Sequence, residues 1–134
     1  MALADDILLA KAEAALLGAE SEFAAGRYDN VANRCYYACF QAAVAALEAV
    51  GIRPSGGPKA RWTHAGVEAQ FVGLLINRRK RYPGRLRNVL PRLFLIRQQA
   101  DYTRERVSEA EARLALRRSR DFLAAIQNDR EDDP

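Results

Sequence analysis

The chain has 134 residues, of which 49% are hydrophobic and 28% are charged, and its formal net charge is +4. These values are typical of one globular domain and argue against two full domains, a long disordered tail or a membrane protein. With one histidine and two cysteines, the chain lacks the ligands for a four-ligand zinc site, an iron–sulfur cluster or a disulfide framework. We therefore expect no metal and no cofactor.

The first residues do not have the pattern of a secretory signal, because they lack a basic start and Asp5 and Asp6 interrupt the apolar run. No apolar stretch approaches the ~20 residues that a membrane span needs. Cys35 and Cys39 are expected to be small buried core residues with free thiols, as in a reducing compartment. We therefore expect a cytoplasmic protein with no membrane association.

Apolar residues recur at spacings of three and four, and no run alternates as a strand would. The sequence predicts an all-α fold, an up-and-down antiparallel bundle of four to five helices. Residues 1–128 are expected to form a single domain, followed by an acidic tail at residues 129–134. The first helix should end at Gly26, and the second should run from Asp29, as N-cap, to Val50 before Gly51.

A flexible loop is expected at residues 53–60, followed by a third helix from about Thr63. The apolar stripe of this helix comprises Val67, Phe71, Leu74 and Leu75. Pro91 lies within the apolar pattern of a fourth helix, so either this helix kinks there or its regular part begins near Pro91. Ser108 and Glu111 form a capping box for a fifth helix. Its core-facing stripe comprises Ala112, Ala115, Phe122, Leu123 and Ile126.

Charge is distributed unevenly along the chain. Residues 1–26 sum to −4, whereas residues 51–92 sum to +9. The basic residues of the densest stretch, which contains no acid, are Arg78, Arg79, Lys80, Arg81, Arg85, Arg87 and Arg92. This stretch can attract a polyanion such as RNA or an acidic partner protein; alternatively, it is a solvated basic surface.

The second helix is apolar nearly all round, which predicts that it is buried on most sides. Its polar residues lie near one stripe: Asn30, Arg34, Tyr37 and Gln41. A guanidinium in such a helix must be paired or must face a cleft or an interface. In the fourth helix, Arg97 interrupts the apolar stripe and Asp101 follows four residues later. Arg97 and Asp101 can form an ion pair that supports the site; alternatively, Arg34 and Arg97 together receive a phosphate.

Three segments, residues 27–47, 63–71 and 97–126, resemble small stand-alone proteins of the HEPN-domain family. The resemblance depends mainly on two tracts: Arg34, Tyr36, Tyr37, Ala38 and Phe40, and then Arg97, Ala100, Asp101 and Tyr102. It implies an antiparallel helical bundle that forms a homodimer and is commonly encoded with a nucleotidyltransferase partner in a toxin–antitoxin-type pair. Many such proteins are metal-independent RNases, and others have lost that activity.

The family's catalytic motif is an arginine followed, after four to six residues, by a histidine on the same helix. Arg34 matches the arginine, and Gln41 stands at the position of the histidine. A carboxamide cannot exchange a proton near neutral pH, whereas an imidazole can. His64 is the only candidate replacement base, and the alternative is a partly buried structural histidine.

Three hypotheses follow. In the first, the protein binds RNA or a nucleotidyltransferase partner through a cleft of Asn30, Arg34, Tyr37 and Gln41, with the arginine-rich stretch as an outer attractor. In the second, it is an active metal-independent RNase toxin that uses Arg34 with His64 or Gln41. In the third, it is a non-catalytic dimerisation module whose polar stripe sets helix register.

Overall fold

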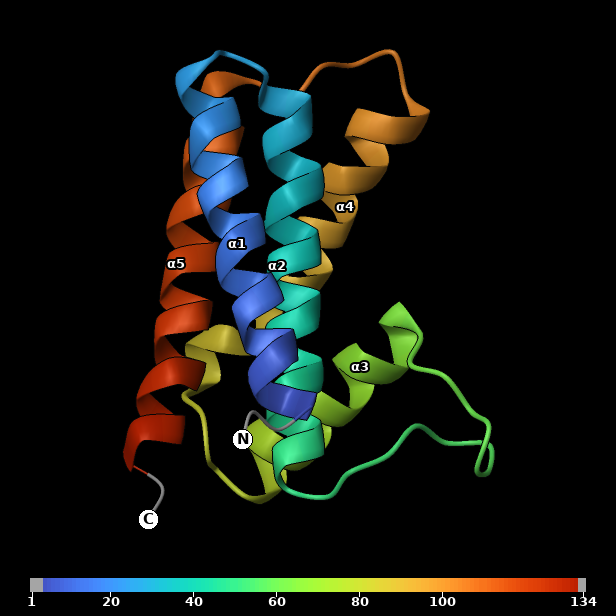
Figure 1. The fold of residues 1–134 in the computed structure, drawn as a ribbon. Helices are drawn as coiled ribbons and strands as arrows, with labels where there is room; N and C mark the ends of the chain where they lie inside the picture. The colour runs from blue at the N-terminus through green and yellow to red at the C-terminus, as the bar shows by residue number, and fades with distance from the viewer. Residues whose placement is uncertain (1–3, 133–134) are drawn as a thin grey trace.

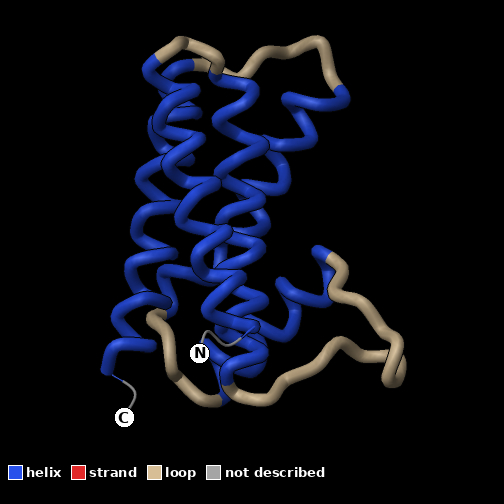
Figure 2. Tube along the Cα trace, viewed as in Figure 1, coloured by secondary structure: helices blue, strands red, loops and turns tan. Residues whose placement is uncertain are grey.

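The computed structural model describes residues 4–132, with side chains from residue 6 to residue 129, and this range forms helices and loops only (Figures 1 and 2). The long helices run up and down beside one another (Figure 1): α1 (Ala4–Ala24), α2 (Tyr28–Ala49), α4 (Val89–Tyr102) and α5 (Glu109–Asp132). Shorter segments lie between α2 and α4: α3 (His64–Gln70), η1 (Phe71–Arg78) and η2 (Gly84–Asn88). The predicted all-α bundle is confirmed.

Glycines follow the ends of the first two helices, as predicted. Gly26 has a φ of 76° and Gly51 a φ of 81°, a region that residues with a Cβ rarely enter. The start of α2 differs from the prediction, because Arg27 is the N-cap and Asp29 lies in the first turn. There the Oδ1 of Asp29 accepts a hydrogen bond from the backbone N of Val107, at 2.8 Å. Asp29 therefore joins the top of α2 to the α4–α5 loop.

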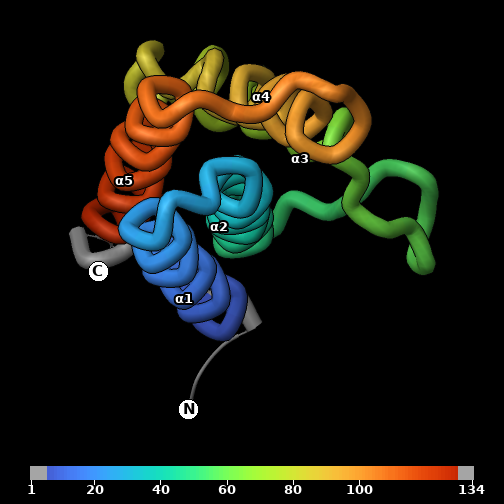
Figure 3. Tube along the Cα trace, turned by 90° about the horizontal axis from the view of Figure 1, so that it is seen from above, coloured from blue at the N-terminus to red at the C-terminus, as the bar shows by residue number. Residues whose placement is uncertain are grey.

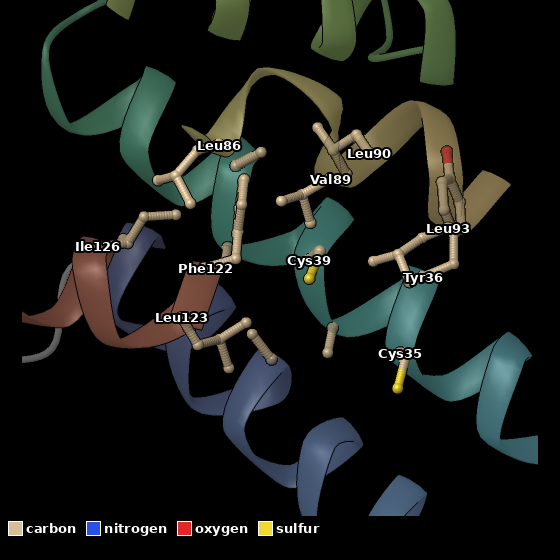
Figure 4. Close-up of a cluster of buried hydrophobic side chains, with 14 of the residues drawn as sticks. Cys35, Tyr36, Cys39, Leu86, Val89, Leu90, Leu93, Phe122, Leu123 and Ile126 are labelled. Carbon is tan, nitrogen blue, oxygen red and sulfur yellow. The ribbon is translucent and has the colours of Figure 1, made fainter. Parts of the chain in front are cut away.

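Helix α2 lies at the centre of the bundle, with α1, α4 and α5 packed around it (Figure 3). Its burial, predicted from its composition, is confirmed. The core between α2, α5 and the start of α4 is drawn in Figure 4 and includes Cys39, Leu86, Leu93, Phe122 and Ile126. The less buried positions of α2 include its polar residues: Asn30, Asn33, Arg34, Tyr37, Gln41 and Glu48.

The predicted third helix divides into two parts. Helix α3 is capped by the Thr63 hydroxyl, and η1 continues it as a π-helix with wider turns. In this region, backbone hydrogen bonds join residues five apart, such as Arg79 N to Leu74 O at 2.9 Å. The wider turn changes which residues face the core, so Ile76 is buried and Leu74 is only half-buried.

The starts of α4 and α5 agree with two sequence signals. Segment η2 leads directly into α4, and Pro91 is the third residue of α4, where backbone N–H groups have no partner within the helix. The helix thus begins near the proline. At α5, the predicted capping box is present: Ser108 N donates to Glu111 Oε1 and Glu111 N donates to Ser108 Oγ, each at 3.1 Å.

The expected acidic tail begins inside α5, since this helix continues to Asp132. Asp129 Oδ2 accepts hydrogen bonds from the Tyr82 hydroxyl and from Arg81 Nε, each at 2.8 Å. Burial and the nearby carboxylate raise the pKa of Tyr82. The first residue of the expected tail is therefore part of the packed structure, and residues 133 and 134 lie outside the described residues.

Replacement of Phe122 by alanine tests the position of the core. Phe122 is fully buried, and its ring centre lies 5.0 Å from that of Phe71. We expect Phe122→Ala to lower the free energy of unfolding by about 3–5 kcal/mol, because it removes apolar contacts and leaves a cavity. Urea denaturation measures this loss. The control Leu114→Ala, at a residue 37% exposed on the same helix, should cost less than about 1 kcal/mol. Equal losses in the two variants would contradict this core.

Candidate functional site

A groove of about 910 Å³ opens where α1, α2 and α4 meet the first residue of α3. Its lining residues are Lys11, Ala14, Ala15, Asn33, Arg34, Tyr36, Tyr37, Phe40, Gln41, His64 and Arg97. The groove thus brings together most of the residues expected to form the cleft and its support: Arg34, Tyr37, Gln41, His64 and Arg97. Among the described residues that line the groove there are three cations, Lys11, Arg34 and Arg97, and no carboxylate.

Arg34 lies on the exposed face of α2, and half of its side-chain surface is accessible to solvent. Its Nη2 is 3.9 Å from Glu22 Oε1, a long ion pair. A Cβ at Gly18 of α1 would lie 2.9 Å from Arg34 Nη1, so the glycine leaves room for the guanidinium. Hydrogen bonds from Arg27 and Asn30 hold the pKa of Glu22 below its ordinary value. Arg34 therefore shares a carboxylate that others already bind.

Arg97 supports the groove from α4, as the first alternative for this residue predicted. Its Nε lies 3.6 Å from Asp101 Oδ2, and its Cζ lies 5.1 Å from the centre of the Tyr36 ring. Asn33 Nδ2 donates a hydrogen bond to Asp101 Oδ1, at 3.0 Å. Burial raises the pKa of Tyr36 to about 12, so the ring stays neutral beneath the guanidinium. These contacts fix α4 against α2.

His64 lies exposed at the edge of the groove, which Arg34 and Gln41 also line. Its ring stacks on that of Phe94, with centres 4.1 Å apart and planes at 15°. The expected partly buried position is therefore wrong, because the N-cap at Thr63 places His64 at the open end of α3. The stacking restricts the imidazole without covering it.

Tyr37 and Gln41 complete the α2 side of the groove. Tyr37 is 47% exposed, which is unusual for an aromatic ring at the centre of a bundle. Gln41 is half-buried and follows Arg34 by seven residues, which corresponds to ~10 Å along the helix on nearly the same face. Together they offer a ring surface, an amide and a guanidinium to one ligand. Asn30 lies outside the groove lining and donates to Glu22 Oε2 at 3.3 Å.

The arginine-rich stretch runs from the end of η1 through η2 into α4, and its paired arginines contact α5 instead of the groove. Arg85 makes two hydrogen bonds to Asp121, each at 2.9 Å, and Arg81 pairs with Asp129. Arg87 Nε donates to Asn77 Oδ1 at 2.8 Å. The hydrogen bond from Arg85 lowers the pKa of Asp121. The basic residues of this stretch that remain exposed and without a contact described above are Arg78, Arg79, Lys80 and Arg92. Of the described residues that line the groove, none belongs to this stretch.

The two cysteines are buried on α2, facing Ser119 of α5. Burial raises the pKa of Cys35 to about 11 and raises that of Cys39 as well. A thiol held in this way is a poor nucleophile near neutral pH. Among the described residues, no three His, Cys, Asp or Glu side chains form a group that could hold a metal ion.

Sequence reasoning missed the contribution of α1. Lys11 lines the groove, and Gly18, seven residues later on the same helix face, leaves room for Arg34. A signal was present, because Lys11 is the single basic residue of α1 and a glycine inside a 21-residue helix is costly unless something packs there.

Comparison with known families bears on this arrangement. The family model described as the HEPN domain matches residues 6–129. The chain belongs to the HEPN family. HEPN domains are generally RNA-binding or RNase-like. No curated protein matches the chain. Among its described residues, this HEPN domain has no helix that is long and apolar enough to cross a membrane.

Proposed function

We propose that this HEPN domain binds single-stranded RNA in the groove. The observation that carries the proposal is the lining itself, in which Lys11, Arg34 and Arg97 occur with the exposed ring of Tyr37, and no carboxylate is found among the described lining residues. Basic side chains attract the phosphate backbone, and an aromatic face stacks an unpaired base. Only a single strand offers bases that are free to stack in this way.

Each side of the groove has a separate part in this function. Arg34 and Lys11 are exposed and can turn toward phosphates, whereas Arg97 is held by Tyr36 and Asp101. The amide of Gln41 can hydrogen-bond a base edge or the 2′-hydroxyl. The 2′-hydroxyl is the group that distinguishes RNA from DNA. Because Glu22 lies 3.9 Å from Arg34, a bound phosphate competes with a weak ion pair only.

The double variant Lys11→Ala, Arg34→Ala tests the groove. We expect its affinity for a single-stranded RNA of twelve nucleotides to fall at least about ten-fold, because two phosphate contacts are lost. Fluorescence anisotropy at several salt concentrations measures this change. The slope of log affinity against log salt should decrease by about 1.4, since each contact to a single strand contributes about 0.7.

The matched control is Arg92→Ala, Arg117→Ala, which removes two exposed arginines of α4 and α5 outside the groove. It should leave the affinity within about two-fold of the original, apart from the small effect of net charge. If the control and the groove variant weaken binding equally, the RNA is held by general positive charge and the proposal fails.

A second candidate function is metal-independent RNA cleavage, favoured by the presence of His64 and Arg34 on one groove. A neutral His64 would take the proton of a 2′-hydroxyl as this oxygen attacks the adjacent phosphorus. Arg34 would stabilise the pentavalent phosphate, and the bond to the 5′-oxygen would break. The products are a 2′,3′-cyclic phosphate and a 5′-hydroxyl, which receives its proton from the imidazolium or from water.

Cleavage assays in EDTA separate the two functions. If the enzyme reading holds, His64→Ala should reduce the rate by about 10²–10⁴-fold without weakening RNA binding. Gel analysis of a labelled RNA measures the rate. The variant Gln41→His is the informative comparison, because it restores an imidazole seven residues after Arg34. If the Gln41→His variant cleaves RNA and the native protein does not, the native protein binds RNA without cutting it.

We also propose that the domain is a cytoplasmic homodimer that pairs with a nucleotidyltransferase antitoxin. The family resemblance supports this, and so do two exposed apolar residues of α1, Ile7 at 50% and Leu17 at 67%. Apolar residues that remain exposed can be covered by a partner. In the non-catalytic alternative, the polar stripe of α2 serves only to set the pairing of two copies.

Light scattering of the purified chain measures its oligomeric state, and we expect a dimer. Leu17→Glu should shift the equilibrium toward monomer by placing a charge in the apolar contact, whereas Leu95→Glu, at a residue 64% exposed on α4, should not. Co-expression with a nucleotidyltransferase encoded beside the gene tests the partner. If Arg34→Ala breaks the dimer and leaves RNA binding unchanged, the hypothesis of a non-catalytic dimerisation module is correct.

A further inference from the structure

A second hollow, of about 560 Å³, lies where the end of α2 meets the loop that leads to α3. In Figure 1 this loop extends away from the bundle at the lower right. The lining includes Glu48, Arg53, Pro54, Pro58, Arg61 and Trp62. We refer to these residues as the loop hollow. None of them lines the groove described above.

Hydrogen bonds hold the loop hollow in shape. Trp62 Nε1 donates to Glu48 Oε2 at 3.0 Å, and both residues are half-buried. Gln70 Nε2 contacts the carbonyl oxygen of Arg53 at 3.5 Å. The tip turns at Gly57, whose φ of 99° suits glycine and whose carbonyl accepts from the backbone N of Ala60 at 3.1 Å. The indole therefore has a defined position instead of moving with the loop.

The chemistry of the loop hollow matches an unpaired nucleotide. Residues 49–67 contain three basic residues and no acid, so the loop attracts phosphate. The indole and the proline rings offer flat apolar surfaces for a base. One oxygen of Glu48 accepts from the indole N–H. A carboxylate has a second oxygen, which can accept from the amino group of a base such as cytosine.

The loop hollow continues the path of the groove. Arg34, Gln41 and Glu48 follow one another at intervals of seven residues, so they lie on nearly one face of α2 over ~21 Å. Arg34 and Gln41 line the groove, and Glu48 lines the loop hollow. On the opposite side, His64 of the groove and Trp62 of the hollow are two residues apart, at most ~7.6 Å between Cα atoms. A strand that leaves the groove past His64 meets Trp62 next.

We propose that the loop hollow is a second subsite for the RNA strand held in the groove. The subsite takes one unpaired nucleotide whose base carries an amino group. The base stacks on Trp62, its amino group donates to Glu48, and the flanking phosphates contact Arg53 and Arg61. This inference rests on the proposed RNA-binding function, and it adds a preference for base type that the groove alone does not supply.

Trp62 is the single tryptophan of the chain, so its fluorescence reports on the loop hollow directly. We expect cytidine 12-mer RNA to quench this fluorescence and to bind more tightly than uridine 12-mer RNA, because uracil has no amino group. Arg53→Ala, Arg61→Ala should weaken binding of the cytidine 12-mer about ten-fold, abolish the quenching and lower the salt slope by about 1.4. Glu48→Gln keeps an oxygen for the indole and should remove the preference for cytidine over uridine.

The control is again Arg92→Ala, Arg117→Ala, which removes the same charge elsewhere and should retain quenching and preference. Unchanged thermal unfolding of each variant, followed by circular dichroism, verifies the fold. If binding depends on Lys11 and Arg34 but not on Arg53 and Arg61, and the fluorescence of Trp62 does not change on binding, the subsite is overturned and the groove function stands. If the native chain binds neither 12-mer at low salt, the groove function fails and the subsite fails with it.

Discussion

The burial of α2 on three sides is the constraint on which the rest of the structure depends. Alanines and cysteines at positions such as Ala38, Cys39 and Ala42 are fully buried and allow α1, α4 and α5 to approach closely. Small side chains give close packing at the cost of little conformational entropy, so the contact depends on shape and any added volume would strain it. A helix covered in this way leaves one face open, and its polar groups gather there because burial without a partner is costly.

The open face of α2 can bind a ligand because its cations are only partly paired with carboxylates. The guanidinium of Arg97 is held between a carboxylate and a ring, whereas Arg34 makes a long contact to Glu22. A fully paired cation has little to gain from a phosphate, and an unpaired one is costly to keep half-buried. The groove combines a rigid cation with adjustable ones, an arrangement suited to a backbone that changes direction from one nucleotide to the next. The seven-residue interval from Arg34 to Glu48 extends the same face of α2 toward the loop, where the indole of Trp62 is already positioned.

Much of the site was predictable from local spacing, and the part that was not depends on contacts between distant segments. The stripe through Arg34, Tyr37 and Gln41 follows from the helical repeat, and the pair of Arg97 with Asp101 follows from the four-residue interval. The arginine-rich stretch was expected to serve as an outer attractor for RNA. Asp121 and Asp129 of α5 neutralise two of its arginines, and these partners lie more than thirty residues away in sequence. The formal charge of this stretch is therefore larger than the positive charge that a ligand can contact.

By itself, the sequence determined the helical class, the burial of α2, the glycines that follow α1 and α2, the capping box of α5 and the family resemblance. The first four depend on residues within a few turns of one another, where intrinsic preference and hydrophobic periodicity act directly. The family resemblance depends on tracts in two separate helices. Only the tertiary structure decided that His64 stacks on Phe94 at the edge of the groove, that Lys11 joins it from α1, and that α5 continues through Asp129. Those outcomes depend on how helices cross and which side chains meet over long separations, which the spacing of residues along one helix does not specify.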